Sequence, residues 1–196
     1  MGDTTWGVDL QFTKTLCPYK GRTYLGRWLV IPRFIVKGSI YHEGTQISCS
    51  GHGYHDHNLY PITAPFTTKG YHFGKIPFGQ NSFTWAHVLK SKTKTQPILI
   101  ISTKDKYFSI DVNDITYTTL KHSTEHNKTI PVDWNINVEA PDIHLDVTLE
   151  SLHRHYVSVP SVHYWRYHTK NTGHITMNSH NFPINNIEIS EYLKFF

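Results

Sequence analysis

The chain has 196 residues, of which 38% are hydrophobic and 14% aromatic, and its formal net charge is +4 with histidine neutral. This length suits one large β domain, or one domain and a fraction. The positive charge is scattered and forms no Arg-rich stripe, which argues against binding to nucleic acid. The two cysteines, Cys17 and Cys49, are too few for a disulfide framework, and we expect free thiols.

Targeting and membrane-spanning segments are not visible in the sequence. The longest apolar runs, residues 28–31 and 98–101, are far too short to cross a bilayer. No charged start followed by an apolar stretch marks a signal peptide. We therefore expect a soluble, cytoplasmic protein with no stable membrane insertion.

Period-two alternation of hydrophobic residues predicts strand after strand along the chain. The clearest alternating segments are residues 6–12, 34–41, 82–89, 107–112, 132–138 and 143–149. Turn residues separate them, and no segment has a convincing helical period with caps. We interpret residues 150–156 as a strand as well. About ten short strands at this spacing are typical of an antiparallel barrel or sandwich.

The run of residues 51–58 brings together three histidines, one carboxylate, one phenol and one amide. Its two glycines, Gly51 and Gly53, let the backbone approach a neighbour closely. In an extended strand, successive side chains alternate between two faces. The two predicted faces are His52, Tyr54, Asp56 and Asn58 on one side, and His55 and His57 on the other.

Metal binding is one interpretation of this run. His55 and His57, two residues apart on one face, can ligate a single ion, and zinc or non-haem iron needs a further ligand from another strand. His153 and His155 repeat the spacing and could supply that ligand. A metal-dependent enzyme is therefore one alternative, although our main expectation is a protein without a cofactor.

Proton transfer is the second interpretation. A carboxyl group that faces an apolar lumen is disfavoured as the anion, so its pKa rises and it can act as an acid near neutrality. Asp56 in such a place could protonate a carbon–carbon double bond. A structural alternative stays open, because Asp, Asn and Tyr on a strand often only hydrogen-bond one another.

Aromatic and basic residues elsewhere are candidates for the walls of a pocket. Aromatic faces stabilise positive charge on carbon, and an Arg166–Asp56 pair would keep Asp56 ionised. The candidate ligand-binding residues are Trp85, His87, Trp134, Trp165 and Arg166. The segment 61–69, which contains Pro61 and Pro65, is either a long connection or a lid over the mouth of the pocket.

Three blocks of the sequence resemble the AttH-like and carotenoid hydratase superfamily, which includes tocopherol-cyclase-like proteins and fungal Diels-Alderases. The blocks are Trp-Leu-Val-Ile-Pro at 28–32, Val-Lys-Gly-Ser-Ile at 36–40, and the run 51–58. The similarity is fainter over 71–88 and 188–195. Two positions depart from the usual pattern: Leu59-Tyr60 stands in place of Trp-Gly, and residues 71–75 stand in place of a Trp-rich strand.

The resemblance implies a lipocalin-like antiparallel β-barrel over residues 1–196, either as a single domain or as one half of a normally two-domain protein. It also implies a small hydrophobic ligand, such as an isoprenoid or polyene, and a second lipocalin-like domain or a homo-oligomer as partner. The hydratase branch shares Tyr54, Asp56 and Asn58, the residues that alternation had already grouped.

We therefore expect a protein that binds a small hydrophobic molecule, with acid-catalysed hydration or cyclisation as its reaction. In that reaction Asp56 protonates an alkene, Tyr54 and His52 relay or orient the proton, and Asn58 positions a water or the carboxyl group. A structural or interaction β domain without catalysis is the remaining alternative.

Overall fold

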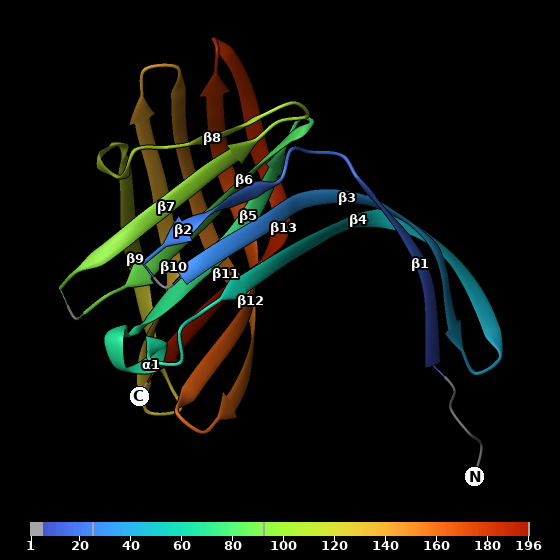
Figure 1. The fold of residues 1–196 in the computed structure, drawn as a ribbon, viewed down its shortest axis with the longest axis horizontal. Helices are drawn as coiled ribbons and strands as arrows, with labels where there is room; N and C mark the ends of the chain where they lie inside the picture. The colour runs from blue at the N-terminus through green and yellow to red at the C-terminus, as the bar shows by residue number, and fades with distance from the viewer. Residues whose placement is uncertain (1–5, 25, 92, 196) are drawn as a thin grey trace.

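The computed structural model describes residues 6–24, 26–91 and 93–195, which form two antiparallel β-sheets and one short helix (Figure 1). In chain order the elements are β1 (Trp6–Lys14), β2 (Tyr19–Thr23), β3 (Gly26–His42), β4 (Thr45–Leu59), α1 (Ala64–Thr67), β5 (Gly70–Phe78), β6 (Asn81–Leu89), β7 (Thr95–Ser102), β8 (Tyr107–Ser109), a 3-10 turn (Val112–Asp114), β9 (Ile115–Glu125), β10 (Lys128–Ala140), β11 (Ile143–Val159), β12 (Val162–Met177) and β13 (His180–Phe195).

The larger sheet has nine strands in the order β8-β7-β6-β5-β13-β12-β11-β10-β9. It curls until β7 contacts β9, but no ladder joins its two edges within the described residues. The expected closed barrel is therefore corrected to an open, curled sheet. The edge strand β8 is only three residues long, and side chains such as Ile101 and Ile115 pack in the common core, so apolar contacts bring the two edges together in place of hydrogen bonds.

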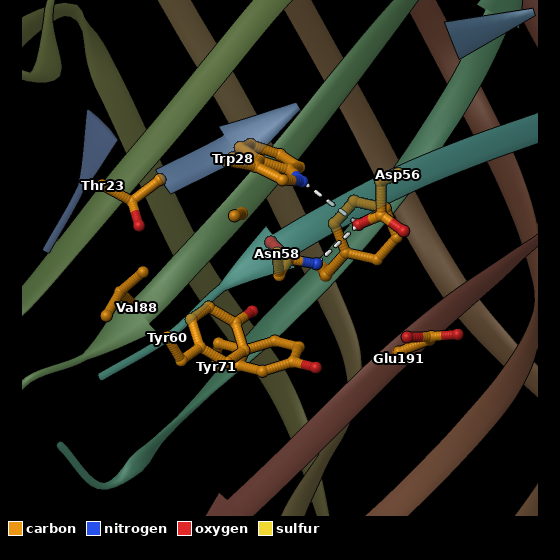
Figure 2. Close-up of a pocket in the computed structure, with 10 residues that line it drawn as sticks. Thr23, Trp28, Asp56, Asn58, Tyr60, Tyr71, Val88 and Glu191 are labelled. Carbon is orange, nitrogen blue, oxygen red and sulfur yellow. Dashed lines mark hydrogen bonds between the residues drawn. The ribbon is translucent and has the colours of Figure 1, made fainter. Parts of the chain in front are cut away.

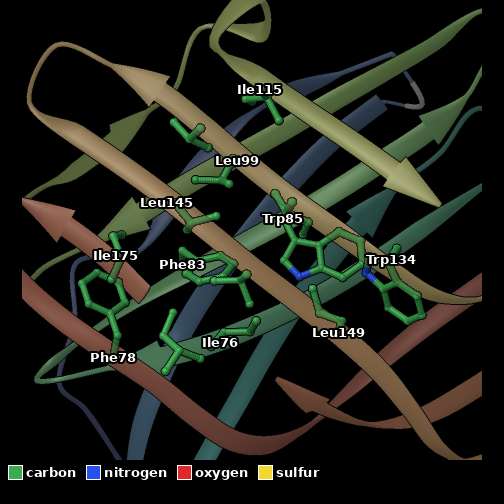
Figure 3. Packing of buried hydrophobic residues seen from close by; sticks show 14 of the residues in the cluster. Ile76, Phe78, Phe83, Trp85, Leu99, Ile115, Trp134, Leu145, Leu149 and Ile175 are labelled. Atoms are coloured by element: carbon green, nitrogen blue, oxygen red, sulfur yellow. The ribbon is translucent and has the colours of Figure 1, made fainter. Parts of the chain in front are cut away.

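The interior of the curled sheet is filled by large side chains (Figure 3). Strand alternation explains this, because every second residue of β10 points inward and is buried, as Trp134, Ile136 and Val138 show. Trp165 and Tyr167 of β12 are fully buried in the same core. Aromatic rings thus supply much of the packed volume.

The smaller sheet is built around the long hairpin of β3 and β4. Its inner half packs on the outer face of the large sheet through Trp28 and Val30, which cluster with Ile100 of β7. Its outer half pairs with β1 and projects beyond the large sheet (Figure 1). The β3–β4 register shifts between Ile31 and Phe34, at the boundary between the two halves.

Most of the predicted strands are confirmed. Of the alternating segments, only 107–112 is largely irregular, since just its first three residues form β8. Residues 150–156 lie within β11, as interpreted, whereas the segment 61–69 contains the unexpected helix α1. Cys17 and Cys49 are both free thiols. No helix in the described part of the chain is long and apolar enough to span a membrane.

Candidate functional site

A recess of about 70 Å³ lies between the inner half of the β3–β4 hairpin and the outer face of the large sheet (Figure 2). Side chains from strands far apart in the sequence meet there. The polar and aromatic ones that matter most are Trp28 of β3, Asp56 and Asn58 of β4, Tyr71 and Phe73 of β5, and Glu191 of β13. The site thus lies outside the curled sheet and not in its interior.

A larger groove of about 370 Å³ adjoins this recess and shares Asp56, Phe73 and Glu191 with it. Tyr54 and Arg166 also line the groove. A water molecule in the liquid occupies about 30 Å³, so the recess has room for one or two waters. The groove falls in the range of about 300–1,000 Å³ that is typical of small-molecule sites.

The Asp56 carboxylate is held through one of its two oxygens. Oδ2 accepts hydrogen bonds from Trp28 Nε1 at 3.1 Å and from Asn58 Nδ2 at 2.9 Å (Figure 2). Both donors can stabilise negative charge that develops on this oxygen, because an ionised oxygen is the stronger acceptor. Oδ1 accepts no well-formed hydrogen bond from the described residues, although the Tyr54 hydroxyl interacts with Asp56, so this oxygen is available to a bound molecule.

Three phenols surround this carboxylate and remain protonated at neutral pH. Burial, and next the charge of Asp56, raise the pKa of Tyr54 and of Tyr60. Burial also raises the pKa of Tyr71, with a smaller contribution from Tyr60. The Tyr54 hydroxyl is buried and makes no well-formed hydrogen bond within the described chain. It is therefore a donor that interacts with Asp56 but is not held by a well-formed hydrogen bond.

The second carboxylate of the cleft is engaged by a cation. Glu191 Oε1 accepts a hydrogen bond from Arg166 Nη2 at 3.3 Å. The Arg166–Asp56 pair considered from the sequence is therefore not formed, and Arg166 lines the groove while its charge is directed to Glu191. The reason is topological, because Arg166 and Glu191 are direct partners in the β12–β13 ladder.

The residues of the run 51–58 divide between several places. Tyr54, Asp56 and Asn58 do share the face that forms the cleft. His52 lies four residues further along the strand, which at about 3.3 Å per residue is roughly 13 Å away. It contacts Arg33 at 2.9 Å and lines a separate groove, so the geometry does not bring it to Asp56.

His55 and His57 are exposed and line two different grooves. No group of three or more His, Cys, Asp or Glu side chains that could hold a metal ion occurs in residues 6–24, 26–91 and 93–195. A third ligand from His153 or His155 is therefore not brought to this pair. The glycines of the run differ too: Phe12 and Val36 approach Gly53 closely, but nothing approaches Gly51.

The tryptophans expected to line the pocket lie on the opposite side of the sheet from Asp56. Trp85, Trp134 and Trp165 are buried in the packed interior. His87 also faces inward, with its ring 4.1 Å from that of Tyr117. On β6 the cleft is lined by the alternate residues, Ala86 and Val88. Alternation places the two sets on opposite faces, so these four candidates do not share a pocket with Asp56.

The interior of the large sheet also holds a buried histidine, His72. His72 is fully buried, its Nδ1 is hydrogen-bonded to the Tyr117 hydroxyl, and its Nε2 has no partner in the described chain. Burial, and next the proximity of His87, lower the pKa of His72 well below its usual value. Burial alone lowers the pKa of His87 to about 4. Both imidazoles are therefore neutral in the folded protein at neutral pH.

Several site residues were not found by sequence reasoning. Trp28 lies in one of the blocks that carry the family resemblance, and Tyr60 and Tyr71 stand where the chain departs from the family pattern. These departures from the family pattern were the signal in the sequence that could have identified Tyr60 and Tyr71 as site residues. Glu191 lies in the segment 188–195 of fainter resemblance, but nothing near it in the sequence indicates that β13 pairs with β5 beside the hairpin.

Comparison with known proteins gives structural relatives only. No family model matches the chain, and no curated protein matches it. Three solved structures share its fold: kievitone hydratase from Nectria haematococca (TM-score 0.68, 12% identity), a protein proposed to be AttH from Nitrosomonas europaea (TM-score 0.62, 10% identity) and CghA with Sch210972 (TM-score 0.61, 7% identity).

The similarity extends over nearly the whole of this chain but not over the whole of its relatives. It covers 96%, 100% and 97% of this chain and 61%, 64% and 62% of the other three, respectively. The chain thus spans a little over three fifths of their lengths. The chain shares the fold of these three proteins, one named a hydratase and one proposed to be AttH, which agrees at the level of the fold with the resemblance carried by residues 28–58.

Proposed function

We propose that the cleft around Asp56 binds a small, mostly apolar molecule and adds water to one of its carbon–carbon double bonds. One observation carries this proposal: a carboxylate with one oxygen held by two donors stands where a water-sized recess adjoins a ligand-sized groove. The hydratase named among the structural relatives supports the same class of reaction.

The carboxyl of Asp56 serves as acid and then as base in the proposed reaction. Its protonated Oδ1 gives a proton to one alkene carbon, and the carboxylate that develops is stabilised by the Trp28 and Asn58 donors on Oδ2. Water from the recess adds to the other carbon, and its surplus proton returns to Asp56. The double bond is replaced by one C–H and one C–O bond, and the acid is regenerated. Ring closure would use the same proton, with an internal nucleophile in place of water.

The other cleft residues orient the two reactants. The hydroxyl of Tyr54, which lacks a well-formed hydrogen bond within the described chain, is a donor for the water or for an oxygen of the ligand. Tyr60 and Tyr71 add protonated phenols to the recess, while the Phe73 ring supplies an apolar surface that the recess and the groove share. This mixture suits a ligand with an apolar body and one polar end, such as a prenylated phenol or an oxygenated isoprenoid.

The experiment begins with native mass spectrometry of freshly purified protein to detect a retained hydrophobic ligand. Prenylated phenols and short polyenes are then incubated with the protein, and the products are searched for the mass of one added water. Asp56→Asn should retain ligand binding and lose water addition, whereas His52→Ala should keep both. Undiminished water addition by Asp56→Asn would reject the proposed role of Asp56.

The metal-dependent alternative predicts a different result. Elemental analysis of the purified protein would then find stoichiometric zinc or iron, and His55→Ala with His57→Ala would remove the metal and the activity together. In the proposed reaction these two substitutions leave the proton transfers intact, because Asp56 performs them, and replacement of His55, which lines the groove, can change only the affinity for the ligand.

A further inference from the structure

Four large apolar side chains are exposed close together at one end of the molecule. Tyr24 is 50% exposed, Leu59 59%, Ile62 93% and Phe66 80%. They belong to the turn after β2, the end of β4 and the α1 segment, and α1 lies at the end of the molecule away from the tip of the β3–β4 hairpin (Figure 1). Ala64 of α1 is buried against Val88, so α1 is anchored while Ile62 and Phe66 point outward.

Cations surround these apolar side chains. Two grooves of about 450 and 440 Å³ share Leu59, Arg22 and Arg27 as lining residues, and no carboxylate lines either groove. Both arginines are exposed, and neither forms an ion pair with a described carboxylate. Lys90 Nζ lies 4.5 Å from the centre of the Tyr24 ring, which adds a third cation beside the apolar residues.

The sequence has a matching asymmetry of charge. Residues 10–104 contain twelve Lys and Arg but only two acidic residues, Glu43 and Asp56. Glu43 is in the turn at the tip of the hairpin, and Asp56 lies in the cleft. Most of the acidic residues therefore lie in residues 105–196, outside the segment 22–90 that carries the exposed apolar side chains and cations of this end.

We propose that this end of the protein docks on the surface of an anionic phospholipid bilayer. The docking face consists of Tyr24, Leu59, Ile62 and Phe66 together with Arg22, Arg27 and Lys90. Exposed aliphatic and aromatic side chains enter the boundary between headgroups and acyl chains, while neighbouring cations contact anionic headgroups. A nucleic acid would use the cations and the two aromatic rings but would leave the aliphatic Leu59 and Ile62 in water, so the combination favours a bilayer.

The docking face adjoins the proposed catalytic cleft. Thr23 and Tyr60 line both the recess and one of the two basic grooves. An apolar molecule that leaves the bilayer at this face therefore reaches the recess without passing the outer half of the β3–β4 hairpin. The docking proposal goes beyond the proposed reaction and does not depend on it, because the exposed apolar residues and cations are present whatever the cleft does.

Vesicle co-sedimentation of the whole chain tests the proposal. We expect the protein to bind vesicles of phosphatidylcholine that contain phosphatidylserine, more weakly as salt is raised, and not to bind phosphatidylcholine alone. Arg22→Gln and Arg27→Gln should each lower the partition coefficient about fivefold. Ile62→Ser and Phe66→Ser should each lower it about tenfold, since each removes an apolar side chain from the interface.

The control variants are Val8→Ser in β1 and Ile47→Ser in the outer half of the hairpin. Their side chains are 69% and 51% exposed. They should bind vesicles like the wild type, and thermal melting should show that every variant is folded. The proposal is overturned if the wild type does not bind anionic vesicles, or if Val8→Ser and Ile47→Ser lose as much binding as Ile62→Ser. It is also overturned if a single-stranded RNA binds through Arg22 and Arg27 while vesicles do not. Each of these results leaves water addition by the cleft to be judged separately.

Discussion

Trp28 donates its indole N–H to Asp56 across the β3–β4 ladder, although the register places Asn58 directly opposite Trp28. Asn58 in turn donates along its own strand to the same carboxylate oxygen. A diagonal contact of this kind is within reach of a long aromatic side chain on one face of an antiparallel pair. The two donors therefore converge on one oxygen and leave the other to the cleft.

The first prediction concerns this hydrogen bond. Trp28→Phe removes the donor and keeps an aromatic ring near Tyr19 and Phe73, and we expect the free energy of unfolding to fall by about 2 kcal/mol. Urea denaturation of Trp28→Phe, Asp56→Asn and the double variant gives the coupling. A coupling near zero would show that the bond does not hold the carboxylate.

The second prediction separates ligand binding from folding at Tyr54. Its hydroxyl is buried without a well-formed partner in the described chain, so Tyr54→Phe should leave the free energy of unfolding within about 0.5 kcal/mol of wild type, or raise it. Affinity for a ligand found by native mass spectrometry should fall about tenfold. A large loss of stability with unchanged affinity would assign the hydroxyl to the fold instead.

The third prediction is a loss of stability in mild acid. The pKa of His72 and that of His87 are lowered in the folded protein, so the unfolded chain binds more protons than the folded chain as the pH falls below about 6.5. The stability that these neutral imidazoles contribute is present above that pH. As the pH falls further, each histidine lowers the free energy of unfolding by up to about 1.4 kcal/mol per pH unit. The contribution of His87 to this slope stops near pH 4, where His87 also becomes protonated in the folded protein.

Urea midpoints between pH 6.5 and 5 measure this slope before most carboxylates titrate. His87→Phe should reduce the slope of the unfolding free energy against pH by the amount that corresponds to about one proton. An unchanged slope would show that His87 does not contribute to the pH dependence. His55→Phe, at an exposed position, is the matched control for replacing a histidine by phenylalanine.

The fourth prediction compares two glycines in strands. A Cβ on Gly74 would lie 2.8 Å from the buried Trp85 ring, whereas a Cβ on Gly51 would meet nothing within 4 Å. Gly74→Ala should therefore cost about 2 kcal/mol through overpacking. Gly51→Ala should be neutral or stabilise by about 0.5 kcal/mol, because alanine restricts the unfolded chain. Equal unfolding free energies for the two variants would contradict the packing described for Trp85.

The face of a strand could be predicted from alternation, but its surroundings could not. Tyr54, Asp56 and Asn58 were grouped correctly because side-chain direction depends only on local backbone geometry. His52 was grouped with them and is on the same hairpin, yet it lies beyond the part of β4 that covers the cleft. Its distance from Asp56 depends on where the hairpin leaves the large sheet, which is a tertiary property.

The inward and outward faces of the large sheet show the same limit. Trp85 and His87 do share a face, but nothing in β6 alone says that Ala86 and Val88 are the residues toward Asp56. The pairing of β13 with β5, which brings Glu191 to the cleft, also requires long-range contacts. The identity of the ligand, the partner domain and the cytoplasmic location stay predictions.

The shift in register between Ile31 and Phe34 divides the β3–β4 hairpin into an inner half and an outer half, although both strands are continuous. The inner part is a wall of the cleft, and the outer part extends into solvent with β1. Because β3 and β4 are continuous through both parts, a molecule bound to the outer part would contact the same two strands that carry Trp28 and Asp56 into the cleft.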